Sequence, residues 1–282
     1  MRFGFVTCVQ LGLSCMEEIY ASGGSLDLVL TLPDDRARSK SGRVYVDQFC
    51  TARGVPLRHI GNINDPDAVA AVRDARIDWL CIIGWSQIAK AELLAAPAVG
   101  CLGMHPTLLP IGRGRAAIPW AILKDLPETG VTLFKLTEGV DSGPILAQER
   151  VPLGPRETAS SLYHKVEVAH RTLIRRVWPD LSQGLINPVA QVDSNATYWP
   201  GRTPDDGRLT AEMTVADADR LIRAVTRPYP GAFLDRGRER LRVWAAHPGT
   251  ADAGGHRLPF ADGELVLDEW DEELVPPNPP AP

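Results

Sequence analysis

The stretch LGMHPTLLPIGRGR, residues 102–115, carries the side chains whose types and spacing point most directly to chemistry. His105 is held between an apolar run and a proline, and a basic, glycine-rich turn follows it. Apart from His59, it is the only histidine in the first 160 residues. An imidazole exchanges protons near neutral pH, so one interpretation is a general base at the end of a strand. The alternative is a packed histidine whose ring only hydrogen-bonds a backbone group.

The elements around this stretch are apolar runs that alternate with helical segments. The runs have little polar–apolar alternation, which is typical of parallel strands covered on both faces. We therefore predict an α/β fold with a doubly wound, mostly parallel sheet, and a hairpin or adjacent strands at 130–136 and 145–151. In such sheets, ligands bind beyond the carboxyl ends of the strands. The loops at 84–89 and 104–110 fall there.

The character of the sequence changes after residue 195. Short strands and many turns follow, among them TYWPGRTPDDG and RPYPGAF. We predict a first domain at 1–195, a small β-rich domain at 196–275 and a proline-rich tail at 276–282.

Composition limits the classes of partner and compartment. The net charge is −5 and the pI near 5.7, a poor electrostatic match to nucleic acid or to an anionic membrane as principal partner. Five scattered cysteines without a CxxC pair indicate neither a zinc site nor a disulfide framework. The N-terminus resembles a first strand rather than a signal peptide, and no apolar run is long enough to span a membrane. We expect a cytoplasmic protein.

Three motifs together are similar to those of a known family. HPTLLP, GRGRAAIPWAI and ETGVTLFKLTEGVDSGPILAQ resemble the N10-formyltetrahydrofolate-dependent formyltransferases, which act on methionyl-tRNA, glycinamide ribonucleotide or sugar amines. The likeness covers most of residues 1–190, with NDPD and GWSQ as weaker supports. RTPDDG and RAVTRPYPGAF resemble the smaller domain of the tRNA and nucleotide-sugar enzymes. The resemblance implies a Rossmann-like catalytic domain, an OB-like second domain, N10-formyltetrahydrofolate as formyl donor and no metal.

The resemblance also implies catalytic roles. His105 matches the family's histidine and Asp141, in GVDSG, its aspartate, 141 − 105 = 36 residues later. His105 would take the proton of the attacking amine, and Asp141 would orient the imidazole and stabilise its cation. The alternative for Asp141 is a residue that caps the DSG turn.

Position 103 departs from the family, because Gly103 stands where the family has asparagine. The asparagine amide normally donates to the developing oxyanion, and losing one such donor can cost on the order of 10²–10³ in rate. Three interpretations follow. In the first, the amide is replaced by a backbone N–H, a water, protonated His105 or the Thr107 hydroxyl. In the second, the glycine makes room for another acceptor or one-carbon donor. In the third, the chain binds folate or nucleotide without turnover.

The remaining site residues are also inferred from the resemblance. The pterin would lie against two segments, comprising Trp85, Ser86, Gln87, Ile88, Gly139 and Val140. Trp85 could equally be a core aromatic. Arg113 and Arg115 are candidates for phosphate or carboxylate contact, and the alternative is a loop that bonds its own carbonyls. The SKSGR loop at 39–43 resembles a mobile basic loop over the site.

The acidic balance and the short chain disfavour tRNA as the acceptor. An amino sugar carried on a nucleotide fits better, because it is a small anionic substrate that suits one or two arginines and the RTPDDG and PYPGAF features. A non-sugar amine or methionyl-tRNA stays open, whereas glycinamide ribonucleotide enzymes typically lack the second domain. A formyltetrahydrofolate hydrolase and a binding protein without catalysis are further alternatives, and a dinucleotide-dependent dehydrogenase is disfavoured because GxGxxG is missing. The expected partners are a small amine and, in a homodimer, a second copy of the chain. The oligomeric state and the choice between N10- and N5-formyl folate stay open.

Overall fold

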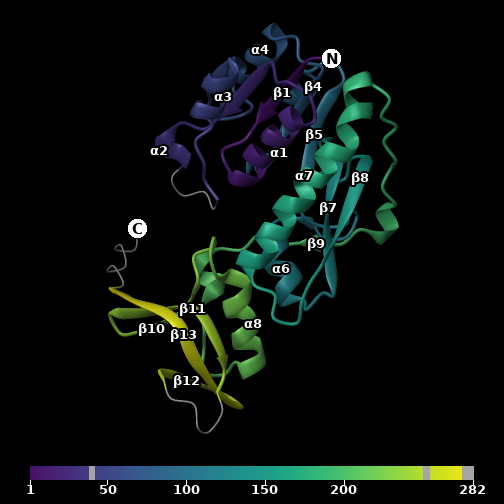
Figure 1. Ribbon diagram of the computed structural model, residues 1–282. Helices are drawn as coiled ribbons and strands as arrows, with labels where there is room; N and C mark the ends of the chain where they lie inside the picture. The colour runs from purple at the N-terminus through teal and green to yellow at the C-terminus, as the bar shows by residue number, and fades with distance from the viewer. Residues whose placement is uncertain (38–41, 250–254, 275–282) are drawn as a thin grey trace. The chain divides into compact units, whose positions relative to one another are not determined.

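The computed structural model describes residues 1–37, 42–249 and 255–274 (Figure 1). Its contacts divide the chain into two compact units. Unit 1 comprises 1–117, 128–152 and 164–199, and unit 2 comprises 118–127, 153–163 and the described residues from 200 onward. The predicted boundaries at 195 and 275 stay predictions, and the predicted tail at 276–282 lies outside the described residues.

A seven-stranded sheet forms the centre of unit 1. Its spatial order is β3 (Leu57–His59), β2 (Leu28–Thr31), β1 (Phe3–Val6), β4 (Trp79–Ile82), β5 (Gly100–His105), β7 (Glu128–Lys135), β8 (Ile145–Pro152). The pairs from β3 to β5 are parallel, while β7 is antiparallel to β5 and β8 to β7. The prediction of a mostly parallel sheet is confirmed, and so is the hairpin at its edge.

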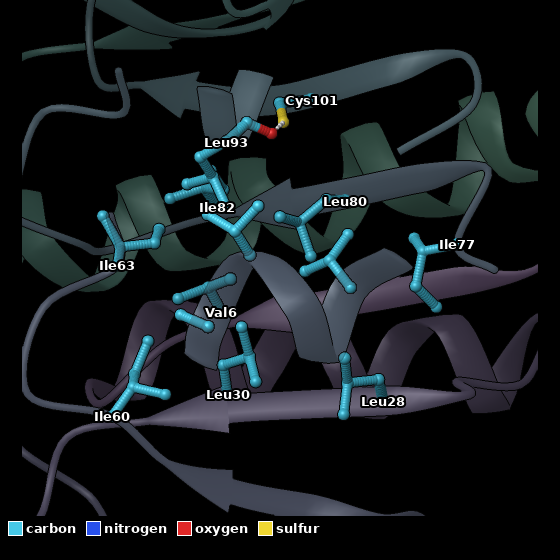
Figure 2. Packing of buried hydrophobic residues seen from close by; sticks show 13 residues of the cluster. Val6, Leu28, Leu30, Ile60, Ile63, Ile77, Leu80, Ile82, Leu93 and Cys101 are labelled. Carbon is cyan, nitrogen blue, oxygen red and sulfur yellow. Dashed lines mark hydrogen bonds between the residues drawn. The ribbon is translucent and has the colours of Figure 1, made fainter. Parts of the chain in front are cut away.

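Helices cover both faces of this sheet. On one face, α1 (Gln10–Ala21) and the unit 1 part of α7 (Ala159–Gln183) pack on the strands. The rings of Phe3 and Trp178 lie 4.4 Å apart, and Sγ of Cys15 lies 3.9 Å from Sδ of Met104. On the other face, α4 (Pro66–Asp74) and α5 (Ala91–Leu94) close an aliphatic cluster that includes Val6 (Figure 2). Burial of apolar strand residues on both sides explains why their sequences do not alternate.

A buried carboxylate joins the two helices of the first face. Glu18 of α1 accepts hydrogen bonds from Arg175 at 2.7 Å and Arg171 at 3.0 Å, both on α7. These guanidinium groups, Arg175 first, lower the pKa of the Glu18 carboxyl despite its burial. The ion pairs tie α7 to the sheet by way of α1.

Shorter elements complete unit 1. These are α2 (Asp34–Ala37), α3 (Asp47–Arg53), a 3₁₀ turn (Asp193–Asn195), and the strands β6 (Arg113–Gly114) and β9 (Tyr198–Trp199). β6 and β9 pair in parallel as a separate two-stranded ladder. This ladder joins the segment after α7 to the turn that follows His105.

Unit 2 is built on a four-stranded antiparallel sheet. Its order is β10 (Ala232–Arg236), β11 (Glu239–Pro248), β13 (Gly263–Leu274), β12 (Arg257–Phe260). Helix α8 (Val215–Val225) buries one face against β11 and β13, and its N-cap, Thr214, accepts from the Asp217 N–H. Most of α6 (Ala117–Leu123) and a 3₁₀ turn (Pro204–Gly207) also belong here. The predicted β-rich second domain is confirmed.

All five cysteines are buried and free. Burial raises the pKa of the Cys81 and Cys101 thiols to about 12, so both are inert near neutral pH. Among the described residues, the structure contains no helix of the length and apolarity needed to cross a membrane.

Candidate active site

His105 is the last residue of β5, at the carboxyl end of the parallel strands. Its ring is buried, and Nε2 lies 2.7 Å from the carbonyl oxygen of Gly112. A carbonyl only accepts, so the proton of the neutral imidazole is assigned to Nε2. Nδ1 then carries the lone pair, and it is the nitrogen that can accept a proton.

A carboxylate faces that nitrogen. Oδ2 of Asp141 lies 3.6 Å from Nδ1 of His105 and accepts the backbone N–H of Gly114 at 2.8 Å. The first distance is too long for a hydrogen bond to the neutral ring. A proton gained at Nδ1 would nevertheless stand 3.6 Å from a carboxylate oxygen. The structure therefore places the imidazole of His105 and the carboxylate of Asp141 side by side.

The turn after His105 is held by side chains from the β7–β8 hairpin. Thr132 Oγ1 donates to the Thr107 carbonyl at 2.7 Å and accepts the Leu109 N–H at 3.0 Å. Gln148, paired with Thr132 across the hairpin, donates to the Leu109 carbonyl at 2.8 Å. These bonds fix the HPTLLP turn with little reliance on its own side chains.

The side-chain hydroxyl of Thr107 differs from the neighbouring polar groups because it is buried and makes no hydrogen bond within the described residues. A buried hydroxyl without a partner is costly and usually has a functional explanation. The Thr107 hydroxyl is therefore a buried donor whose hydrogen-bonding capacity is unused within the described residues.

Gly103 lies two residues before His105, on the same side of β5, between Ile82 of β4 and Phe134 of β7. A Cβ placed on Gly103 would come within 2.7 Å of Cδ2 of Leu136. The side chain of Leu136 thus occupies the space that the Cβ of any larger residue at position 103 would need.

The two arginines of the RGR turn differ. Arg113 is buried, and its guanidinium donates to Gln191, to Asp193 at 2.6 Å and to the Tyr198 hydroxyl at 3.0 Å. The guanidinium of Arg113 is thus used for bonds within the protein, in agreement with a structural role rather than with contact to a substrate anion. Arg115 is exposed, and its guanidinium has no hydrogen bond or ion pair with any residue that the structure describes.

The two segments predicted to hold the pterin are surface loops. In the loop after β4, the Gln87 amide accepts from the Ile63 N–H and donates to the Gly61 carbonyl, while Trp85 is partly buried against the core. Ser86 is exposed beside them. Ile88 and Val140 expose apolar side chains, 70% and 49% respectively, and Gly139 precedes Val140 in an exposed turn.

The SKSGR segment is described only at Gly42 and Arg43, because 39–41 lie outside the described residues. Arg43 pairs with Asp34 at 2.8 Å and stacks over the Tyr45 ring at 4.3 Å. Its Nε and Nη1 have no partner among the described residues. An open cavity of about 980 Å³ adjoins it, lined also by Asp47 and His59.

Matches to family models decide the classification. Residues 36–177, half of the chain, match the model described as formyl transferase, and this range contains His105 and Asp141. Residues 202–275 match the model described as formyl transferase, C-terminal domain. The chain belongs to the formyl transferase family.

Solved structures of three proteins share this fold. Methionyl-tRNA formyltransferase from Clostridium thermocellum superposes with a TM-score of 0.62 at 17% identity, covering 98% of this chain and 99% of that one. An N-formyltransferase from Helicobacter canadensis, in complex with folinic acid and dTDP-3-aminofucose, gives 0.68 at 14% identity, covering 96% and 98%. HypX from Aquifex aeolicus, in complex with tetrahydrofolic acid, gives 0.66 at 18% identity. The match covers 96% of this chain, which spans only 44% of HypX.

Four residues that hold the site were not predicted from the sequence: Thr132, Gln148, Gln191 and Thr197. Thr132 and Gln148 fall in one of the quoted motifs, and their facing positions in the predicted hairpin are a usable signal. Thr197 accepts the Gly112 N–H at 2.8 Å and Gln191 bonds to the Asp141 segment, both far apart in sequence from their partners. No local pattern marks these two. Among the described residues, no three histidine, cysteine or acidic side chains are grouped as metal ligands.

Proposed function

We propose that this protein transfers the formyl group of N10-formyltetrahydrofolate to the primary amine of a small anionic acceptor. Membership of the formyl transferase family makes formyl transfer the reaction class. The observation that carries the mechanism is the His105–Asp141 pair, with Nδ1 3.6 Å from Oδ2 and Nε2 capped by the Gly112 carbonyl.

His105 acts as general base at Nδ1. The formyl donor supplies an activated formyl carbon, which the amine nitrogen of the acceptor attacks. His105 takes the proton that the amine loses, and Asp141 stabilises the resulting imidazolium. The same Nδ1–H then protonates the departing nitrogen, so the imidazole returns to its neutral form. Because Gly112 fixes the tautomer, the ring is oriented for this exchange before substrate binds.

The developing negative charge on the formyl oxygen needs a donor other than a side chain at 103. We assign this role to the Thr107 hydroxyl, with the His105 imidazolium as a second source. The support is that the buried hydroxyl has no other partner among the described residues. A donor aimed at the transition-state oxyanion is worth about 3–4 kcal/mol in known cases.

The formyl donor is assigned to the loops at 85–88 and 139–140. The supports are the exposed apolar side chains of Ile88 and Val140, which suit a flat heteroaromatic ring, and the folates bound in the structures of the Helicobacter canadensis protein and HypX. Backbone groups of Gly139 and of the Trp85–Ser86 segment would supply the polar contacts.

The acceptor that we favour is an amino sugar carried on a nucleotide. The Helicobacter canadensis protein binds such a molecule, dTDP-3-aminofucose, and matches nearly the whole chain. Arg115 is the guanidinium group that suits its phosphates, because it is exposed and has no partner among the described residues. Arg43, which borders the cavity described above, is a second candidate whose two unpaired N–H groups are buried. We further propose a cytoplasmic enzyme that forms a homodimer.

The deciding assay follows tetrahydrofolate release from N10-formyltetrahydrofolate, with the formylated product identified by mass spectrometry. The reaction is run without amine, then with nucleotide-linked amino sugars, free amino acids and methionyl-tRNA. Release that requires a nucleotide-linked amino sugar supports the proposal. Release that requires methionyl-tRNA or a free amino acid shows that this other amine, and not an amino sugar, is the acceptor. Release without any amine indicates a hydrolase. Donor binding without release under every condition would contradict catalysis.

A further inference from the structure

Gln191 bridges the Asp141 turn and Arg113, and we propose that it is a positioning residue that holds the Asp141 carboxylate opposite His105. This inference rests on the roles proposed above for His105 and Asp141. Gln191 lies outside both matched family ranges, in the segment between α7 and β9.

The backbone at Asp141 needs such support. Its φ is +49°, in the left-handed region, which aspartate adopts more readily than most residues other than glycine but still at a cost. The turn is exposed at Glu138, Gly139 and Val140, so packing contributes little to its conformation. Hydrogen bonds must therefore define where the Asp141 side chain leaves the backbone.

The Gln191 side chain supplies two of these bonds. Its Nε2 donates to the carbonyl of Asp141 at 2.7 Å and to that of Gly143 at 2.8 Å. Both carbonyls flank Ser142, so one amide group holds the two ends of the turn. The Asp141 carboxylate is held separately, by the Gly114 N–H.

Arg113 fixes the orientation of the Gln191 amide. Its Nε and Nη2 donate to Oε1 of Gln191 at 3.1 Å and 2.8 Å. A guanidinium only donates hydrogen bonds, and backbone carbonyls only accept them. The side chain at 191 therefore needs an acceptor atom facing Arg113 and two N–H bonds facing the carbonyls of Asp141 and Gly143. An amide of glutamine length meets both requirements, whereas a carboxylate meets only the first.

Three consecutive residues, Gly112, Arg113 and Gly114, therefore contact the groups that hold His105 and Asp141 in place. The Gly112 carbonyl binds Nε2 of His105, the Gly114 N–H binds Asp141, and the Arg113 side chain holds Gln191 against the Asp141 turn. Because Gly112, Arg113 and Gly114 are consecutive, the separation of His105 and Asp141 is set by one short rigid segment. Gln191 completes the frame on the Asp141 side.

The test is Gln191→Glu, which keeps the acceptor for Arg113 and removes the two N–H donors. Gln183→Glu is the matched control, since Gln183 is an exposed glutamine at the end of α7. Among the described residues, its Nε2 bonds only the nearby Pro179 carbonyl. Gln191→Met, of similar length, serves as a second variant. We expect kcat to fall about 10- to 100-fold in both Gln191 variants, with the KM of the formyl donor within about twofold of wild type.

A double-mutant cycle separates positioning from general structural support. If Gln191 acts through Asp141, Gln191→Glu should change kcat by less than about twofold in an Asp141→Asn background. An equal loss of kcat in both backgrounds would overturn the inference, and so would an unchanged kcat in the single variants. The melting temperature of each variant accompanies these rates to confirm folding.

An acceptor-independent readout separates this inference from the proposed function. The Gly114 amide proton, observed by 1H–15N spectroscopy, reports its bond to the Asp141 carboxylate. We expect its resonance to move in Gln191→Glu and in Asp141→Asn, and to stay in place in Gln183→Glu. An unmoved resonance in Gln191→Glu overturns the inference whether or not the wild type shows turnover. Absence of turnover with a moving resonance contradicts the proposed function alone.

Discussion

Cδ2 of Leu136 lies 2.7 Å from the position that a Cβ would take on Gly103, and its Cγ lies 3.3 Å away. The first distance is shorter than real carbon–carbon contacts, so any side chain at 103 requires Leu136 to move. Leu136 is held by its backbone N–H, which donates to the Cys101 carbonyl at 2.8 Å, while its side chain packs on the core beside β4. Residues 103 and 136 are therefore coupled.

This coupling gives the first prediction. Gly103→Asn alone should lower stability by about 1–3 kcal/mol, because it overpacks the site. Gly103→Asn combined with Leu136→Ala should recover stability relative to Gly103→Asn and reach wild-type kcat or more, since the amide then has room to donate to the oxyanion. Thermal melts and steady-state rates of both variants, with Leu136→Ala as control, check this. Strictly additive effects would show that Leu136 does not limit position 103.

A second prediction concerns Thr107→Val, which keeps the shape of the side chain and removes the hydroxyl. We expect kcat to fall by about 10-fold or more, since the oxyanion loses a donor. Stability should not fall, because the lost hydroxyl has no partner within the described residues. An unchanged kcat would show that a group other than the Thr107 hydroxyl donates to the oxyanion.

A third prediction concerns acceptor recognition. Arg115→Ala should raise the KM of a nucleotide-linked acceptor by about 10-fold, the effect of one charge-assisted contact, with little change for the formyl donor. Arg58→Ala, an exposed arginine on β3, is the control. Equal KM values for the two variants would remove Arg115 from the acceptor site.

A fourth prediction follows from a second buried histidine. Burial lowers the pKa of His170, on α7, to about 4, although the Val166 carbonyl accepts from its ring at 2.7 Å. In the unfolded chain a histidine titrates near 6.5, so between about pH 6.5 and 4 the unfolded state binds the extra proton. Stability must fall as the pH falls through this window, by about 2 kcal/mol at pH 5.

His170→Phe should remove that part of the acid sensitivity, while His164→Phe, at an exposed position on the same helix, should not. Urea unfolding at pH 7.5 and pH 5, followed by tryptophan fluorescence, measures the difference. The idea fails if His170→Phe loses as much stability on acidification as the wild type does.

The sequence predicted the sheet well because the apolar strand runs and their turns are local features. It also placed His105 at a carboxyl strand end for the same reason. Asp141 opposite His105 came from the family resemblance, since nothing in the spacing alone brings the two together. Arg113 was taken as a possible anion contact from its residue type, but its burial depends on Gln191, Asp193 and Tyr198, which pack on it from about 80 residues away.

The Leu136 side chain beside Gly103 was equally out of reach of sequence patterns. Its position depends on how the chain continues beside β5 after β7 ends, a matter of side-chain packing rather than of periodicity. Sequence analysis therefore identified Gly103 as a departure from the family, and the structure adds which residue occupies the space.

The rate of formyl transfer by His105→Ala, measured with and without added imidazole, tests directly whether His105 is the general base. The account predicts a fall in kcat of about 10²–10⁴-fold, a formyl-donor KM close to wild type, and partial recovery when imidazole supplies the missing base. Recovery should be weaker in the His105→Ala/Asp141→Asn double variant, which lacks the carboxylate that favours the cation. A folded His105→Ala protein that transfers formyl groups at the wild-type rate would contradict the account.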